Sequence, residues 1–222
     1  MKKESVFSSS QWSLKKSKLA VLVPCRDMLH AAFAMCLTEL VKLNTMNNID
    51  THVVMDASTV LLTQRTRLAQ EAQKVGAEYM LWLDSDMVFP ATTAMRLMAH
   101  KESVVAANYV RRQLPAKGVA YEKIGDWTNP LPFKSQDELV PVEGIGMGCM
   151  LVKTSILKEI PKPWFEFHWT EESNDYLGED MDFCMKMKKS GHTVKVDTNL
   201  SMELRHMGTW AFGSDLIKSN QV

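Results

Sequence analysis

The chain has 222 residues, 45% of them hydrophobic and 23% charged, and its 26 Lys and Arg balance its 26 Asp and Glu. This length suits one domain with a substantial core. The zero net charge argues against a nucleic-acid binder that works through bulk charge, although a local basic patch stays open. No apolar run reaches the length of a membrane-spanning helix.

The N-terminus is basic and rich in serine, but the apolar run that follows, Leu19–Val23, is too short for a signal peptide. We expect residues 1–17 to be a polar lead-in. The four cysteines are far apart and include no C-x-x-C pair, so they predict neither a zinc site nor a disulfide framework. Reduced thiols favour a cytoplasmic protein.

Strand-like and helix-like segments alternate through the first two thirds of the chain. The predicted elements are a strand at Lys18–Val23 ended by Pro24, a helix over about 31–43, a strand at Thr51–Met55, a helix capped by Ser58 or Thr59 that runs to about Val75, a strand at Tyr79–Leu83, a short helix from near Thr92 and a strand at Val104–Ala107. This order predicts an α/β fold with a doubly wound, mostly parallel sheet, helices on both faces and ligands at the carboxyl ends of the strands.

Residues 111–138 are rich in Pro, Lys, Gly and Asp and suggest an excursion that faces a substrate. Beyond them we expect a Gly-spaced strand at Val142–Val152, an aromatic-rich loop at Trp164–Trp169, a helix over about 178–190 and a strand at Thr193–Val196. The aromatic loop either stacks on a substrate or packs as a cluster. We place one domain at 18–210, with halves at 18–110 and 111–210, and a C-terminal tail at 211–222.

Two carboxylates, Asp84 and Asp86, directly follow the apolar strand Tyr79–Leu83. A buried carboxylate needs a cation or hydrogen bonds to offset its desolvation. Divalent cations such as Mg²⁺ prefer oxygen ligands. The position therefore favours a metal site that holds a diphosphate over the alternative, a turn in which the aspartates direct the chain and cap the next helix.

Three further carboxylates, Glu179, Asp180 and Asp182, open the predicted helix after Gly178. Acidic residues in a first turn are also stabilised by the helix dipole, so a charged turn is one interpretation. The other is a base that takes a proton from an attacking hydroxyl. Asp180 and Asp182 are two positions apart and face different directions on a helix, so we expect only one of them to serve.

His206 lies near the end of the predicted domain, where a C-terminal segment can fold back over a metal site. We expect the other five histidines to be structural. A neutral imidazole suits Mn²⁺ better than Mg²⁺.

Arg65 and Arg67 either lie on the solvated face of a helix or reach a pyrophosphate, which a planar guanidinium binds well. Arg111 and Arg112 are candidates for the same role. The run Gly144–Gly148 is not a dinucleotide fingerprint. Its glycines at alternate strand positions instead suggest backbone close to a ligand.

In this order, the features resemble a GT-A-fold glycosyltransferase of the family 2 type, close to its small bacteriophage-encoded members. The matching segments are Val21–Pro24, Arg65, Leu83–Pro90, Glu143–Cys149, Gly178–Cys184 and His206–Gly208. Many relatives carry Arg-Asn where this chain has Arg65-Thr66.

The resemblance implies a nucleotide-sugar-binding half at 18–110 and an acceptor and catalytic half at 111–210. It implies that Asp84, Asp86 and His206 hold Mn²⁺ or Mg²⁺ and the diphosphate. Asp180, in the Glu179-Asp180 pair, would be the catalytic base. The predicted donor-binding residues are Pro24, Cys25, Arg26, Asp56, Arg65, Asp84, Ser85, Asp86 and Gly146.

The sequence thus predicts a metal-dependent enzyme that transfers a sugar from a nucleoside-diphosphate sugar to an acceptor hydroxyl. We expect a UDP-sugar as the donor and inversion of configuration at the transferred sugar. Three classes of acceptor remain possible: hydroxymethylated phage DNA, a protein and a small molecule. Residues 111–123 offer a local basic surface for DNA. We expect no membrane insertion and a cytoplasmic location, in the host cytoplasm if the protein is phage-encoded.

Two other functions stay open. A nucleotidyltransferase also places paired carboxylates on such a sheet, but its phosphate loop is rich in glycine, and the segment Pro24–Leu29 contains none. A non-catalytic nucleotide-sugar or metal-binding module would bind the donor without hydrolysis or transfer.

Overall fold

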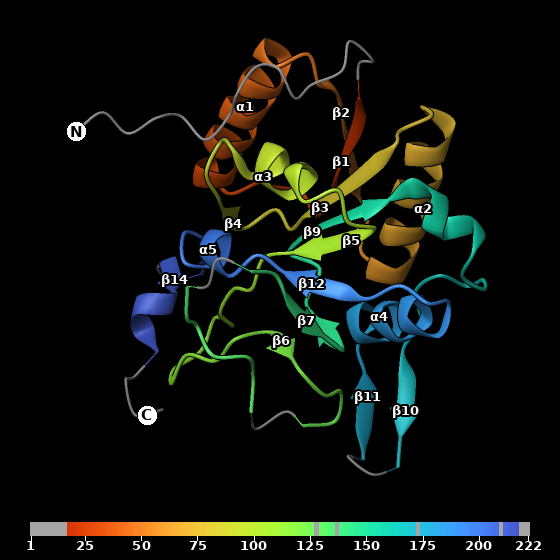
Figure 1. The fold of residues 1–222 in the computed structure, drawn as a ribbon, viewed down its shortest axis with the longest axis vertical. Coiled ribbons are helices and arrows are strands. Elements are labelled where there is room, and N and C mark those ends of the chain that lie inside the picture. Colours follow the sequence, from red (N-terminus) through yellow and green to blue (C-terminus); the bar gives the residue numbers. More distant parts are fainter. Residues whose placement is uncertain (1–16, 127–128, 136–137, 172–173, 209–210, 218–222) are drawn as a thin grey trace.

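The computed structural model describes residues 17–126, 129–135, 138–171, 174–208 and 211–217. Nearly all of the expected N-terminal lead-in lies outside these ranges. The centre of the fold is a seven-stranded sheet of order β2-β1-β3-β9-β5-β12-β7 (Figure 1). Its strands are β1 (Lys18–Cys25), β2 (Asp50–Ala57), β3 (Tyr79–Leu83), β5 (Val104–Ala106), β7 (Val140–Val142), β9 (Cys149–Lys153) and β12 (Val194–Val196).

Five of these seven strands run in the same direction. β1 pairs in parallel with β2 and β3, and β12 pairs in parallel with β5. β9 is antiparallel to both of its neighbours, β3 and β5, and β7 is antiparallel to β12. The predicted fold class, α/β with a doubly wound and mostly parallel sheet, is confirmed.

Helices cover both faces of the sheet. They are α1 (Ala31–Met46), α2 (Leu61–Lys74), α3 (Thr93–Ala99), α4 (Glu179–Lys189) and the single turn α5 (Thr198–Ser201). α1 packs with α3 on one side, and α2 and α4 lie on the other (Figure 1). Among the described residues, no helix combines the length and the apolar character needed to cross a bilayer.

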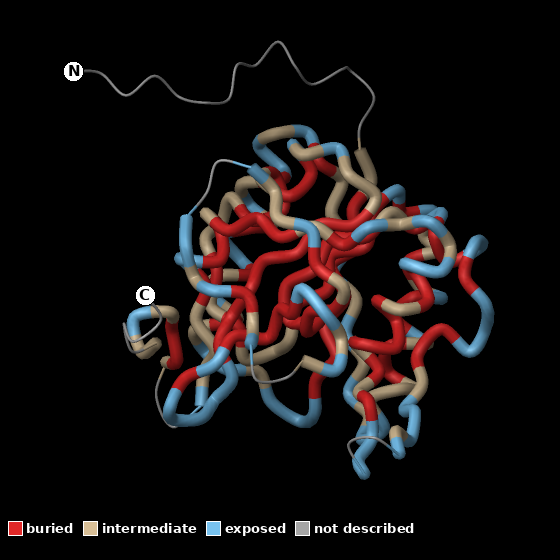
Figure 2. Tube along the Cα trace, turned by 60° about the horizontal axis from the view of Figure 1, so that its bottom comes forward, coloured by how far each residue is buried: buried red, intermediate tan, exposed pale blue. Residues whose placement is uncertain are grey.

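Buried residues concentrate in the sheet, where Leu19–Val23 of β1 and most of β3 have no solvent contact (Figure 2). The aromatic-rich loop expected at Trp164–Trp169 has two parts with different environments. Trp164 and Phe165 pack into the core, and the Phe165 ring meets Trp82 edge-on at 5.6 Å between centroids. Its last residues, His168 and Trp169, begin an exposed hairpin of β10 (His168–Thr170) and β11 (Asp175–Leu177). This hairpin extends beyond α4 (Figure 1).

Three small pairings complete the fold. β4 (Met87–Val88), β13 (Arg205–Met207) and β14 (Ala211–Gly213) form one sheet, and β6 (Ala120–Tyr121) pairs with β8 (Gly144–Ile145). Short 3-10 turns lie at Thr154–Lys158 and Ser214–Leu216. Residues 211–213 were expected in a tail, but they form β14 because β13 offers them a free edge. All four cysteines are free thiols, as expected.

Several element boundaries differ from prediction for local reasons. Pro24 does not end β1, because the β1–β3 pairing stops at Leu22 and the missing N–H breaks no ladder there. Neither Ser58 nor Thr59 caps α2, whose N-cap is Val60 without a side-chain hydrogen bond. The single strand expected at Val142–Val152 is three separate strands, β7, β8 and β9, because the chain turns at Glu143 and again after Ile145.

Candidate active site

The two carboxylates after β3 lie on a tight turn at the edge of the sheet. The Asp84 N–H donates to the Gly148 carbonyl at 3.2 Å, and the Met87 N–H donates back to the Asp84 carbonyl at 3.0 Å. The backbone therefore fixes where Asp84 and Asp86 leave the strand. The Asp86 carbonyl accepts the Met207 N–H at 2.7 Å, which ties this turn to β13.

His206 is brought to Asp86 by the pairing of β13 with β4, in which His206 lies opposite Met87. Its Nε2 is 3.3 Å from Asp86 Oδ1, and its Nδ1 is 3.0 Å from the Val110 carbonyl oxygen. The Tyr109 ring packs edge-on against the imidazole, 5.3 Å between centroids. The C-terminal segment thus folds back over the carboxylates, as the sequence predicts.

The chemistry of this pair fits a divalent cation. When Nδ1–H donates to the Val110 carbonyl, Nε2 presents a lone pair toward a carboxylate oxygen. Two facing acceptors require a proton or a cation between them. An imidazole oriented by a backbone carbonyl is also the usual form of a histidine metal ligand. His206 and Asp86 would therefore hold the predicted Mn²⁺ or Mg²⁺.

The second oxygen of Asp86 contacts a basic residue. Arg112 Nη1 is 2.8 Å from Asp86 Oδ2, and the arginine side chain is half-exposed. Without a cation between His206 and Asp86, a proton on His206 Nε2 makes their contact a hydrogen bond. Burial raises the pKa of the Asp86 carboxyl, but the hydrogen bond and charge of a protonated His206, followed by the charge of Arg112, outweigh burial and lower the pKa. Asp86 is thus held as an anion.

Asp84 points to a different partner, Arg65 of α2. Arg65 Nη2 is 3.4 Å from Asp84 Oδ1, and Arg65 Nε donates to Glu179 Oε1 at 3.0 Å. The three predicted metal ligands are only partly assembled: Asp86 and His206 are adjacent, whereas the ligand atoms of all three residues do not lie within 4.8 Å of one another. Burial, followed by the nearby carboxylates, raises the pKa of Asp84 against the opposing charge of Arg65.

Arg65 is almost fully buried, 3% exposed, and its guanidinium lies 5.6 Å from the centre of the Trp82 ring. Its third nitrogen, Nη1, is buried and has no hydrogen-bond partner among the described residues. A buried unpaired donor is costly, so this guanidinium retains capacity for one more acceptor. The solvated-face interpretation of Arg65 is wrong, whereas Arg67 is exposed and lies 3.8 Å from Asp56.

Asp180 opens α4 and lines a cavity. Burial and the adjacent charge of Glu179 raise the pKa of Asp180 to about 6, against the opposing charge of Arg65. A carboxylate with a pKa in this range can both accept a proton near neutral pH and hold it. The pKa of Asp180 therefore lies in the range that a general base requires.

Asp182 faces away from Asp180, as helical geometry requires. Its carboxylate is 2.8 Å from Lys186 Nζ and 2.6 Å from His168 Nε2. With Glu166 and His168 it forms the one group among the described residues with three metal-ligand atoms within 4.8 Å of one another. Lys186 already supplies the positive charge there, since its Nζ lies 2.5 Å from Glu166 Oε2. The structure does not bring Asp182 to the site with Asp84 and Asp86.

The predicted nucleoside-binding residues lie where β1 and β2 end. Pro24 and Cys25 are buried, whereas Arg26 is exposed. The Cys25 thiol lies 3.5 Å from the Asp56 carbonyl. Gln64 of α2 joins the two strand ends, because its Nε2 donates to the carbonyls of Cys25, Asp56 and Ser58.

Ser85 and Gly146 have backbone roles in the structure. The Ser85 carbonyl accepts the His30 N–H at 3.3 Å. A Cβ at Gly146 would lie 2.4 Å from the Tyr109 hydroxyl, and one at Gly148 would lie 2.7 Å from it. The close approach predicted for these glycines is therefore to Tyr109, and a ligand is not needed to explain it.

Tyr109 and Gln64 are site residues that sequence reasoning missed. Tyr109 is buried, and its hydroxyl accepts the Gly148 N–H at 3.1 Å. The sequence shows that Tyr109 follows the strand β5, but only the tertiary structure places it against His206. Gln64, a buried amide beside Arg65, carried a signal, since a polar residue on the inner face of a helix needs partners.

No protein-family model and no curated protein matches the sequence. Solved structures match it in fold. A197 from STIV is 18% identical, covers 90% of this chain and 91% of its own, and has a TM-score of 0.57.

Two further structures are more distant. A glycosyltransferase involved in the glycosylation of the major capsid of PBCV-1 is 16% identical over 66% of this chain and 68% of its own, with a TM-score of 0.35. S. aureus TarS 1-349 is 14% identical over 81% of this chain and 57% of its own, with a TM-score of 0.43. The similarity to A197 spans nearly the whole of both chains and shows a shared fold.

Proposed function

We propose that this protein is a metal-dependent glycosyltransferase that moves a sugar from a nucleoside-diphosphate sugar to an acceptor hydroxyl. The observation that carries the proposal is the pair formed by Asp86 and His206, 3.3 Å apart at the edge of the sheet where ligands of such folds bind. A carboxylate and an oriented imidazole suit a divalent cation. A UDP-sugar is the first donor to test.

On the donor side, Asp86 and His206 would hold Mn²⁺ or Mg²⁺, which neutralises charge on a departing diphosphate. Arg112, which contacts Asp86 and is half-exposed, is placed to bind phosphate oxygens as well. The strand ends at Cys25 and Asp56, joined by Gln64, would receive the nucleoside.

On the acceptor side, Asp180 would take the proton from the attacking hydroxyl. Its raised pKa supports this role, because a base with a pKa close to the working pH is both ionised and able to take up a proton. A single displacement assisted in this way inverts the configuration at the transferred sugar. Glu179 would hold the start of α4 in place through Arg65.

The proposal is tested by thermal denaturation with UDP-, GDP- and TDP-sugars and, as a donor that carries only one phosphate, a CMP-sugar, each with and without Mn²⁺. A ligand that binds the native state raises its stability by mass action. We expect one donor to raise the melting temperature only when Mn²⁺ is present, and Asp86→Asn to remove the shift. Asp50→Asn, at the opposite end of β2 from the site, is the matched control.

Release of nucleoside diphosphate from the same donor then separates the candidate functions. Release that depends on Mn²⁺ and on Asp180 supports a transferase. Donor binding with neither hydrolysis nor transfer would make the protein a binding module. Absence of any metal-dependent shift across the four donors would overturn the proposal.

A further inference from the structure

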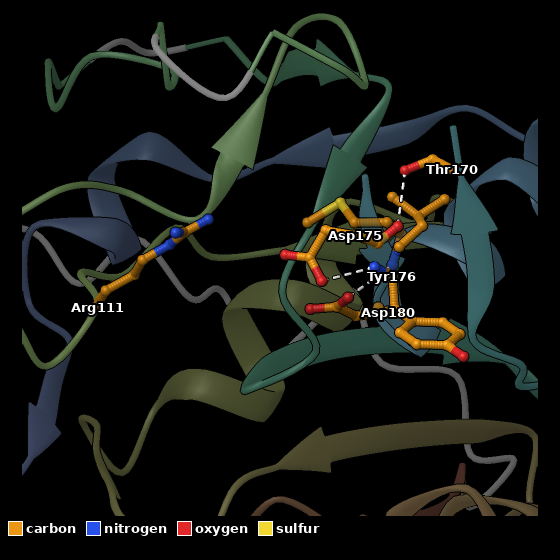
Figure 3. A pocket seen from close by; sticks show the side chains of 8 residues that line it. Arg111, Thr170, Asp175, Tyr176 and Asp180 are labelled. Carbon is orange, nitrogen blue, oxygen red and sulfur yellow. Dashed lines mark hydrogen bonds between the residues drawn. The ribbon is translucent and has the colours of Figure 1, made fainter. Parts of the chain in front are cut away.

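A cavity of about 440 Å³ adjoins Asp180. It is bounded by the start of α4, by the β10–β11 hairpin and by Arg111, which follows β5 (Figure 3). Its size falls within the range of roughly 300–1,000 Å³ typical of small-ligand pockets. The predicted base is therefore part of the wall of a cavity large enough for a substrate.

The hairpin places an exposed aromatic ring at this cavity. Tyr176 lines it and is 64% exposed, so its ring is accessible to a ligand in the cavity. Trp169 lies opposite Tyr176 in the hairpin register, and the two rings meet edge-on, 5.2 Å between centroids. Trp169 thus supports the Tyr176 ring from within the hairpin.

The cavity is acidic. The carboxylates of Asp175 and Asp180 lie between Arg111 and the Tyr176 ring (Figure 3). The Asp175 carboxylate uses Oδ1 to accept the Tyr176 N–H at 2.7 Å, which leaves a second oxygen on the same group. The one cation of the lining, Arg111, donates from Nη2 to the Tyr121 hydroxyl at 2.6 Å and packs over that ring.

The two carboxylates in the cavity lining favour some classes of acceptor over others. A duplex DNA acceptor would bring phosphates toward two carboxylates, while the nearest guanidinium is directed to Tyr121 and Arg112 to Asp86. Arg112 lies outside the lining of this cavity, and Arg111 shares that lining with the two carboxylates. Carboxylate oxygens instead accept hydrogen bonds from neutral hydroxyl groups.

We infer that the acceptor is a neutral saccharide, held in this cavity with its apolar ring face on Tyr176 and its hydroxyls on Asp175 and Asp180. The inference rests on the proposed function and specifies its acceptor class. An amphipathic molecule that is apolar on one face and rich in hydroxyls at its edges matches an exposed aromatic ring beside two carboxylates. Tyr176 and Asp175 determine specificity, and Asp180 receives the proton.

The test uses three methyl glycosides, of glucose, galactose and mannose, as probes. Their binding is measured by saturation-transfer NMR without donor, and separately by their stimulation of nucleoside-diphosphate release. We expect binding of at least one glycoside, weakened about tenfold by Tyr176→Ala and retained by Tyr176→Phe. Phe167→Ala is the matched control, since Phe167 is 49% exposed but lies outside the cavity lining.

The NMR arm needs no donor, so it distinguishes failure of this inference from failure of the proposed function. Glycoside binding that depends on Tyr176 supports the saccharide site even if no donor is turned over. If no glycoside binds, the inference is overturned, whatever the donor does. It is equally overturned if a duplex containing 5-hydroxymethylcytosine stimulates release and the glycosides do not. Thermal melting of each variant verifies that it is folded.

Discussion

Arg65 and Glu179 form a buried ion pair, Nε to Oε1 at 3.0 Å, that joins two parts of the site. The same guanidinium contacts Asp84 with its Nη2 at 3.4 Å. Because α2 carries Arg65 and α4 carries Glu179, one side chain connects Asp84, after β3, to the residue that precedes the proposed base Asp180. The distance between the two halves of the site therefore depends on Arg65.

Replacing Arg65 with Gln should destabilise the fold strongly. The substitution leaves Glu179 buried and Asp84 half-buried without their cation, and breaking a buried pair such as Arg65–Glu179 costs about 3–5 kcal/mol. Urea denaturation followed by tryptophan fluorescence measures the loss. Arg67→Gln is the control on the same helix: its exposed pair with Asp56, at 3.8 Å, should contribute less than about 1 kcal/mol. Equal effects of the two substitutions would contradict the assignment.

The rate of transfer should fall as the pH drops below about 6. Burial and Glu179 raise the pKa of Asp180 to about 6, and Asp180 accepts a proton only when it is ionised. A pH–rate profile of acceptor-dependent nucleoside-diphosphate release should therefore show an acidic limb near this value. Asp180→Asn should abolish the acceptor-dependent release and, with it, the acidic limb of the profile.

Glu179→Gln should move that acidic limb to lower pH. The substitution removes a negative charge that raises the pKa of Asp180, and it leaves the charge of Arg65, which lowers that pKa, less neutralised. The sign follows from both effects. A limb that shifted upward or stayed in place would show that another group controls it.

Asp86→Asn should nearly abolish transfer at saturating donor, because it removes one ligand and half of the acceptor pair with His206. His206→Ala should weaken the affinity for Mn²⁺, by more than the 10–100-fold roughly typical of residues that only orient a ligand. Titration of the activity with Mn²⁺ separates the two effects. Full activity in the Asp86→Asn variant would exclude it as a metal ligand.

Gly146→Ala should destabilise the protein because its Cβ would lie 2.4 Å from the Tyr109 hydroxyl. Overpacking of this kind typically costs about 1–3 kcal/mol. In a Tyr109→Phe background the clashing oxygen is absent, so the second substitution should cost less there. A double-mutant cycle on the free energy of unfolding measures the coupling. If the two substitutions change the free energy of unfolding additively, the Tyr109 side chain moves away from residue 146 and the predicted clash does not occur.

Much of the fold could be predicted from the sequence because its signals are local. The apolar run at Tyr79–Leu83 and the helical spacing after Ala31 report burial and period directly, and both elements form close to the expected residues. The carboxylates after β3 and those that open α4 were also visible, since a charge at the end of an apolar segment is a property of neighbouring residues.

What the sequence alone determined is therefore the α/β class, the order of its elements and the chemical types available at their ends. Tertiary structure alone decided the rest, because it depends on contacts between distant residues. The insertion of β9 between β3 and β5 places Gly148 beside Asp84. The pairing of β13 with β4 brings His206 to Asp86. Arg65 reaches Glu179, 114 positions away, because α2 and α4 pack on the same face of the sheet.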